Sequence, residues 1–344
     1  MNPFWNSSER RLRSLLRIGL QLILFLLFAL GLVFIMSDLL MPLIPPDSPL
    51  LAIRFRNNFL LGELTSPLIA LGATLLSMFL AAKFLDRRPF REFGFHKGKG
   101  WWGDFFFGLG LGAVLMGFIF LVELSLGWIR VIGFFSPNGG NPFWLGILID
   151  LITFICVGIY EEMLLRGYFL RNLAEGMNFR RIKPTTALLL ATFFSSFIFS
   201  ILHLANPGAS IFSFINLLIG GIFLSLGFIL TGELAIPIGL HIAWNFFQGV
   251  VFGFPVSGVV AINPVISIEQ TLNNPLTGGI FGPEAGAIGL LATLLGSFLI
   301  LAWCRKRKGN ITLQANLAIY QDSTKQSAAI SPDNSPSETN EFFR

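Results

Sequence analysis

Two adjacent carboxylates and an arginine stand at the end of a long apolar stretch of this chain. Glu161 and Glu162 are followed four residues later by Arg166. Charged residues make up only 12% of the chain and hydrophobic residues 53%, so a charged group in such a stretch needs a reason. Because charges inside a bilayer are energetically unfavourable, the group indicates a functional site. The alternative is that these charged residues only mark the cytoplasmic boundary of the membrane.

The spacing assigns the two carboxylates to different roles. Residues four apart on a helix lie one above the other, which places Glu162 beside Arg166 with the carboxylate on the favourable N-terminal side. Glu161 points about 100° away and has no local counter-ion. A desolvated carboxylate without a partner is a stronger base, which suits general acid–base chemistry. We therefore predict that Glu162 supports the site and that Glu161 carries the chemistry.

Three polar residues later in the chain would complete a peptide hydrolase. His203 ends an apolar segment, while His241 and Asn245 are four apart and share a helix face. Glu161 with His203 would activate a water molecule. His241 and Asn245 would donate hydrogen bonds to the oxyanion of the tetrahedral intermediate. The alternative is structural: an interfacial His203, and a His241–Asn245 pair that bonds helices together.

A metal centre fits the same side chains. Glu161, His203 and His241 would hold Zn²⁺ and leave one coordination position open for water. The short His-Glu-x-x-His spacing of many zinc proteases is absent from the sequence. The cofactor thus stays open between none and zinc.

Apolar runs long enough to cross a bilayer must position these residues. The mean hydropathy is +0.71, and the runs are continuous. We predict an all-α fold, a polytopic membrane helix bundle with about eight transmembrane helices. The predicted spans are 18–40, 67–85, 101–128, 142–173, 184–205, 209–230, 234–252 and 285–303.

The basic residues of the chain orient this bundle. With eight spans, the clusters in 1–17, 86–99, 171–183 and 305–308 all fall on one side. By the positive-inside rule, both termini are cytoplasmic. The net charge of +5 is therefore not a nucleic-acid signal. We expect an integral multi-pass protein of a bacterial-type inner or plasma membrane.

The same pattern predicts four regions. Residues 1–85 hold a basic segment and two transmembrane helices, and residues 86–252 form the catalytic core. An extracytoplasmic loop and the last transmembrane helix span 253–308. Residues 309–344 are polar and read as a disordered cytoplasmic tail.

Three motifs, in this order, resemble the CPBP family. They are Glu161-Glu162-x-x-x-Arg166, Phe199-x-x-x-His203 and His241-x-x-x-Asn245. That family comprises the type II CAAX prenyl endopeptidases and the bacteriocin-processing and immunity (Abi) proteins. The resemblance implies a glutamate-dependent intramembrane endopeptidase. By match, Glu161 and His203 activate water, His241 and Asn245 form the oxyanion hole, and Glu162 and Arg166 buttress them.

The resemblance also implies the partners. The substrate would be a membrane-associated peptide or protein, of the prenylated CAAX type or the bacteriocin type, cleaved within the lipid bilayer and without nucleic acid. One alternative is a non-proteolytic immunity protein, regulator or scaffold of the same fold. Another is a transporter that uses Asp150 and Glu161 as a proton relay.

The depth of His203 is a difficulty for this hypothesis. His203 lies nineteen residues after Pro184, about 28 Å along a helix, whereas Glu161 is predicted near the cytoplasmic side. Either the helix that starts at Pro184 begins well outside the bilayer, or it tilts strongly.

Overall fold

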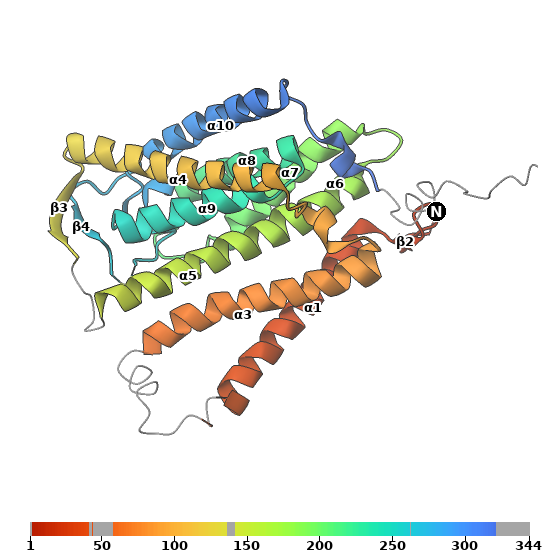
Figure 1. Ribbon diagram of the computed structural model, residues 1–344, viewed down its shortest axis with the longest axis horizontal. Coiled ribbons are helices and arrows are strands. Elements are labelled where there is room, and N and C mark those ends of the chain that lie inside the picture. Colours follow the sequence, from red (N-terminus) through yellow and green to blue (C-terminus); the bar gives the residue numbers. More distant parts are fainter. Residues whose placement is uncertain (1, 41–42, 44–57, 136–141, 262, 321–344) are drawn as a thin grey trace, which may run out of the picture.

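The protein is a bundle of long apolar helices that run roughly side by side (Figure 1). A computed structural model describes residues 2–40, 43, 58–135, 142–261 and 263–320. The principal helices are α1 (Ser14–Phe34), α3 (Asn58–Leu80), α4 (Lys99–Ser125), α5 (Phe143–Glu162), α6 (Arg171–Met177), α7 (Pro184–Leu202), α8 (Ile211–Thr231), α9 (Ala235–Phe246) and α10 (Ala287–Lys308).

Short π-helical segments extend several of these helices. They are η1 (Ile35–Leu40), η3 (Ala81–Asp86), η5 (Met163–Leu170) and η6 (Phe247–Val251). Among the described residues, seven helical segments are long and apolar enough to cross a membrane. An eighth apolar helix, Ala235–Val251, is shorter. The predicted fold class, a polytopic helical bundle, is confirmed.

Two small antiparallel two-stranded sheets mark the opposite ends of the bundle (Figure 1). At one end, β1 (Trp5–Asn6) pairs with β2 (Arg11–Leu12). At the other end, β3 (Ile129–Phe134) pairs with β4 (Ile266–Gln270). The β3–β4 sheet connects the segment after α4 to the long loop between η6 and α10.

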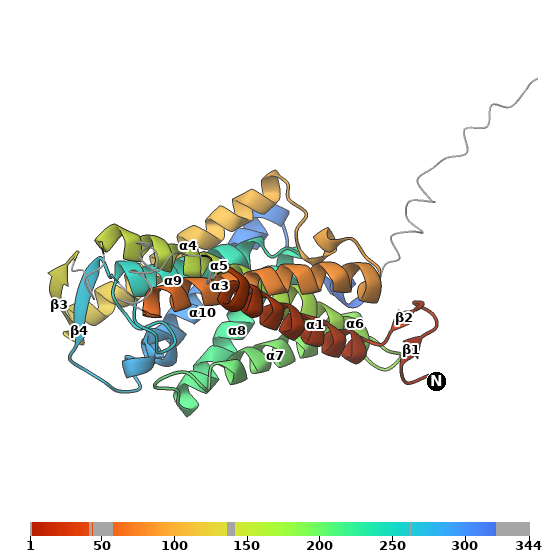
Figure 2. The same ribbon diagram turned by 90° about the horizontal axis from the view of Figure 1, so that it is seen from below.

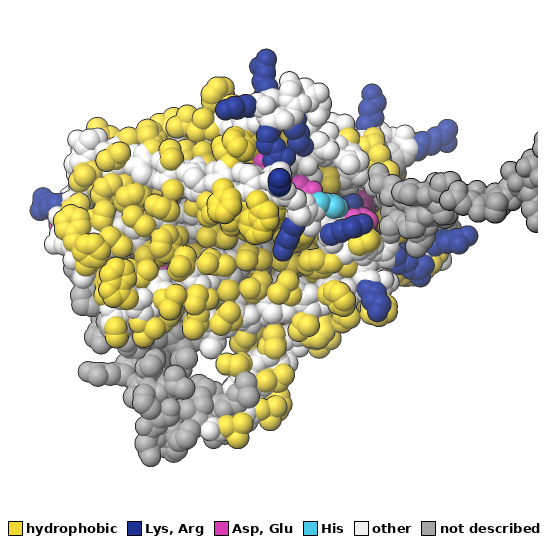
Figure 3. Space-filling view, in the orientation of Figure 1, with side chains coloured by type: hydrophobic (Ala, Val, Ile, Leu, Met, Phe, Trp, Pro, Cys, Tyr) yellow, Lys and Arg dark blue, Asp and Glu magenta, His cyan; other side chains and the backbone are white. Residues whose placement is uncertain are grey.

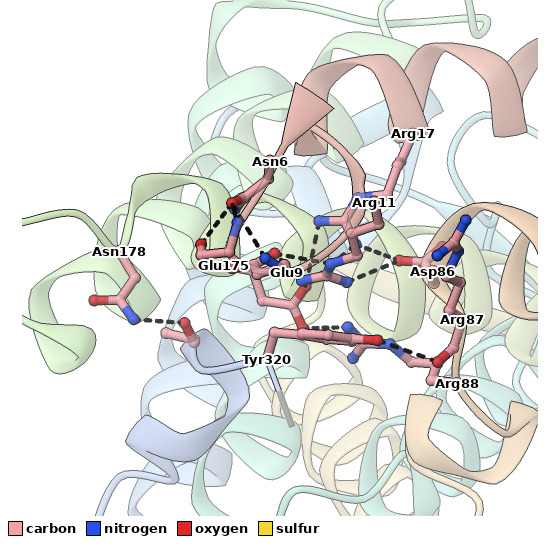
Figure 4. Close-up of polar contacts among 12 residues, drawn as sticks. Asn6, Glu9, Arg11, Arg17, Asp86, Arg87, Arg88, Glu175, Asn178 and Tyr320 are labelled. Atoms are coloured by element: carbon pink, nitrogen blue, oxygen red, sulfur yellow. Dashed lines mark hydrogen bonds and ion pairs between the residues drawn. The ribbon is translucent and has the colours of Figure 1, made fainter. Parts of the chain in front are cut away.

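Basic side chains gather mainly at the end that carries β1 and β2, while apolar side chains cover most of the face in Figure 3. A buried ionic cluster organises that end (Figure 4). Glu175 accepts hydrogen bonds from Arg11 at 2.8 Å and from Arg88 at 2.6 Å, and Arg17 donates to Asp86 at 2.8 Å. The cluster therefore joins the N-terminal hairpin and α1 to η3 and α6.

The segment after α10 differs from the predicted disordered tail as far as residue 320. Leu317 and Ala318, in the 3₁₀ turn η9 (Ala315–Ala318), are buried. The ring of Tyr320 lies 3.5 Å from the guanidinium of Arg11. This segment packs because its apolar residues cover the ionic cluster and α6. Residues 321–344 lie outside the described residues.

Close glycine contacts bring α9 against α4. A Cβ atom on Gly108 would meet the backbone oxygen of Ile236, and one on Gly239 would meet that of Phe105. Small residues let helix backbones approach closely in a membrane. The short helix α9, which carries His241 and Asn245, is thereby fixed inside the bundle.

Candidate active site

The predicted site residues line one large cavity between the helices. The cavity has a volume of about 890 Å³, and Glu161, His203, His241 and Asn245 all contribute to its wall. They come from α5, the C-terminal end of α7 and α9. The structure thus brings together side chains that lie up to 84 positions apart in the chain (161 to 245).

His203 and Glu161 lie at similar distances from the basic end of the bundle, because α5 is part of a longer helical segment. The segment Phe143–Met177 runs through η5 and α6 without interruption. Its α6 end packs against the first part of α7. Glu161 lies sixteen residues before Met177, about 24 Å, and His203 lies nineteen residues after Pro184, about 28 Å. Glu161 therefore lies deeper in the bundle than the sequence predicted.

A buried network surrounds Glu162. Arg166 Nη1 donates to Glu162 Oε1 at 2.9 Å, and both residues are fully buried. His241 Nδ1 donates to the same oxygen at 2.8 Å. Arg166 also donates to the carbonyl of Gly221 at 3.1 Å. These bonds connect η5, α8 and α9, and they fix the imidazole ring of His241.

Because Nδ1 of His241 is occupied, its Nε2 is the nitrogen that faces the other carboxylate. Nε2 lies 4.0 Å from Glu161 Oε2. Tyr160 donates to Glu161 Oε1 at 3.4 Å, and Oε2 has no hydrogen-bond partner among the described residues. Among the described residues, Glu161 Oε2 is thus left without a hydrogen bond beside His241, a neighbour that the sequence had not predicted for it.

His203 caps the C-terminal end of α7 and is partly buried. Its Nδ1 lies 2.7 Å from the carbonyl oxygen of Phe199. A carbonyl only accepts, so Nδ1 carries the proton and Nε2 of the neutral ring is free to accept one. The ring of Phe199 lies 4.6 Å from the His203 ring and 6.3 Å from the His241 ring, which makes it a spacer between the two histidines.

Asn245 lies one turn beyond His241 on α9 and is buried. No hydrogen bond from its side chain occurs within the described part of the chain. Its amide therefore keeps both donors for a molecule in the cavity.

Two groups of cavity residues were not predicted from the sequence, which placed no site residue in 1–85 or 253–344. Ile18, Leu22 and Phe25 of α1 form part of the wall, and α1 is the helix nearest the viewer in Figure 2. Ser257 and Glu284 come from the loop between η6 and α10. The only signal for Glu284 was its charge in an otherwise apolar and glycine-rich stretch, because no motif spacing includes it.

A metal site is not assembled in this arrangement. Within the described ranges, no three His, Cys, Asp or Glu side chains come close enough to hold a metal ion. Glu161, His203 and His241 are all described, so the predicted zinc ligands do not converge on one point.

Asp150 is separate from the main site. It is buried and lines a second cavity of about 350 Å³ together with Ser66. Thr153 and Tyr160 line both cavities, so a shared wall separates Asp150 from Glu161. The structure therefore does not place the two carboxyl groups of the suggested proton relay in one cavity.

Residues 142–247 match the family model described as Rce1-like, type II CAAX prenyl endopeptidase Rce1-like. The matched segment runs from α5 to α9 and contains every predicted site residue. The predicted resemblance is thereby confirmed, and it indicates CAAX-type intramembrane protease activity. No curated protein and no solved structure matches the chain.

Proposed function

We propose that this protein is a glutamate-dependent intramembrane endopeptidase. It hydrolyses a peptide bond of a membrane-associated peptide or protein. The observation that carries the proposal is the convergence of Glu161, His203, His241 and Asn245 on one cavity among apolar helices. This arrangement supplies a base, hydrogen-bond donors and a space for the substrate.

In the proposed first step, a water molecule is activated between Glu161 and His203. Among the described residues, neither Glu161 Oε2 nor His203 Nε2 has a hydrogen-bond partner. The Glu161 carboxylate orients the water molecule and His203 Nε2 takes its proton, while the water oxygen attacks the peptide carbonyl carbon. The same proton then goes to the leaving amine as the C–N bond breaks.

The oxyanion that forms in this attack needs donors. Asn245 supplies N–H groups that bind no atom of the described residues. His241 donates from Nε2 when both its ring nitrogens are protonated, and Glu162 supports this imidazolium form at Nδ1. Preorganised donors of this kind each contribute about 10²- to 10³-fold to the rate.

We further propose the substrate class and the orientation. The apolar α1 wall suits a lipid-modified or apolar anchor, of the prenylated CAAX or bacteriocin type, next to the scissile bond. Both termini would lie in the cytoplasm of a bacterial-type cell, because the basic clusters lie opposite the β3–β4 end. The substrate would then enter the cavity from the bilayer, past the α1 wall.

The test uses the full chain in liposomes with a fluorogenic prenylated CAAX peptide, and membrane proteomics to find other substrates. Glu161→Gln keeps the side-chain size and removes the carboxylate that activates the water together with His203, so we expect at least a 10²-fold loss of cleavage. The control is Glu269→Gln, a substitution at an exposed site on β4. Wild-type cleavage by Glu161→Gln would exclude the mechanism. Cleavage lost on chelation and restored by zinc would exclude its metal-free form.

A further inference from the structure

Glu284 places a third carboxyl group in the cavity. It lies in the 3₁₀ turn η8 (Pro283–Ala285), between η6 and α10, and lines the same wall as His203. Neither the family match nor the motifs include it, since the matched segment ends at residue 247. A partly buried carboxyl group in such a loop needs a partner or a role.

Hydrogen bonds from Ser257 and Gln248, together called the cradle below, hold this carboxyl group in place. Ser257 donates to Glu284 Oε1 from its hydroxyl at 2.6 Å and also from its backbone N–H. Gln248 forms a further side-chain hydrogen bond to Glu284. Gln248 is itself held by the carbonyl of Pro255 at 2.5 Å.

The backbone of this cradle is bent into an unfavourable conformation. Ser257 has φ +47 and Gly258 has φ +83, between the bridged residues Val256 and Val259. Two consecutive positive φ values form the tight hairpin turn that usually requires glycine or asparagine. A serine at the first position is strained, and such strain persists mainly at functional sites. The turn directs both donors of Ser257 to Glu284.

The cradle is connected to His203. Asn206, three residues after His203, donates from its amide to the carbonyl of Ser257 at 3.0 Å. Both side chains line the same cavity, and a positive charge on His203 would lower the pKa of the Glu284 carboxyl. A change in the charge or position of Glu284 therefore changes the electrostatic environment of the His203 imidazole.

We propose that Glu284 is a positioning residue for peptide hydrolysis, whose negative charge orients His203 and stabilises the imidazolium that forms when His203 accepts the proton of water. This inference rests on the proposed function. Glu284 itself forms and breaks no bond. Ser257 and Gln248 act by keeping the carboxylate at this position and in its charged form.

The decisive variant is Glu284→Gln. It keeps the size of the side chain and an acceptor oxygen for Ser257, but it removes the charge. With the same peptide and liposomes, we expect kcat to fall about tenfold, a part of the 10²- to 10⁴-fold that a general base contributes. KM should not rise, and the thermal unfolding temperature should not fall. Glu269→Gln should leave all three values unchanged.

Ser257→Ala separates the cradle from the charge. It removes one hydrogen bond and keeps the carboxylate, so we expect a lower unfolding temperature and a smaller loss of kcat than in Glu284→Gln.

Two results would overturn the inference: an unchanged kcat in Glu284→Gln, or a loss of kcat that only follows a loss of folded protein. Glu161→Gln is measured in parallel. If Glu161→Gln is inactive and Glu284→Gln is fully active, this inference alone fails. If Glu161→Gln cleaves normally, the proposed mechanism fails.

Discussion

Glu161 and Glu162 are neighbours in the sequence, yet the helix directs them to different surroundings. Glu162 is fully buried and shares one oxygen between Arg166 and His241. Glu161 lines the cavity and keeps a free oxygen. The Glu162 carboxylate therefore stabilises the bundle, while the Glu161 carboxylate is available to a water molecule.

This difference predicts that the same substitution, Glu to Gln, lowers the unfolding temperature at one position and leaves it unchanged at the other. Glu162→Gln removes the charge that compensates the buried guanidinium of Arg166. Breaking a buried ion pair costs about 3–5 kcal/mol, so we expect a clearly lower unfolding temperature. Glu161→Gln breaks no such pair and should unfold like the wild type. Thermal unfolding in detergent measures both variants, and equal unfolding temperatures would contradict the assignment.

Glu284 predicts a pH dependence of stability. Withdrawal from bulk water raises the pKa of the Glu284 carboxyl above its usual value, although the hydrogen bonds from Ser257 and Gln248 oppose the shift. The folded state then binds the proton more tightly than the unfolded state. Stability falls as pH rises from the unfolded pKa through the raised folded pKa.

Glu284→Gln removes this loss of stability at rising pH because the glutamine side chain is neutral at every pH. We expect the variant to gain stability over the wild type between about pH 4.3, the ordinary glutamate value, and higher pH. Unfolding temperatures at pH 5 and pH 8 provide the check, with Glu269→Gln as the control. A larger advantage of the variant at pH 5 than at pH 8 would have the wrong sign.

At the scale of elements, the contact between α4 and α9 positions His241. Gly108 and Gly112 of α4 leave room for the backbone of α9, at Ile236 and Leu240 respectively. His241 follows directly after the second contact. Packing between these two helices therefore determines where the imidazole lies relative to Glu162.

Two glycines of α4 provide a matched pair of variants. A Cβ on Gly108 would meet the backbone of α9, whereas one on Gly110 would meet nothing within 4 Å. Gly108→Val should lose about 1–3 kcal/mol of stability through overpacking and should lower the cleavage rate. Gly110→Val should change neither. Unfolding and cleavage of the two variants are compared, and equal effects would exclude the packing argument.

For the molecule as a whole, the two ends differ in charge and in structure. One end carries the buried cluster around Glu175 and most of the basic side chains (Figures 3 and 4). The other end carries the β3–β4 sheet. This asymmetry supports the proposed orientation, because positively charged segments remain on the cytoplasmic side.

Single cysteines test the orientation. Lys97 and Arg130 are exposed at opposite ends, while the native Cys156 and Cys304 are buried. In intact cells, a membrane-impermeant thiol reagent should label Arg130→Cys. It should label Lys97→Cys only after the membrane is opened. The reverse pattern would show an inverted protein.

The sequence by itself determined the features that depend on neighbouring residues. The apolar runs placed the helices within a few residues of their observed ends, since length and hydropathy decide whether a helix spans the bilayer. The four-residue spacing identified the Glu162–Arg166 pair, because helix geometry alone brings those residues together. The three motifs contain five residues that line the cavity: Glu161, Phe199, His203, His241 and Asn245.

Only the tertiary structure decided the features that depend on how helices pack. The bond between His241 and Glu162 joins residues 79 positions apart, and the one between Ser257 and Glu284 joins residues 27 apart. No helical period relates such pairs. The depth of Glu161 followed from the continuation of α5 through η5 and α6. The role proposed for Glu284 required a strained turn and a loop folded into the cavity, which hydropathy cannot predict.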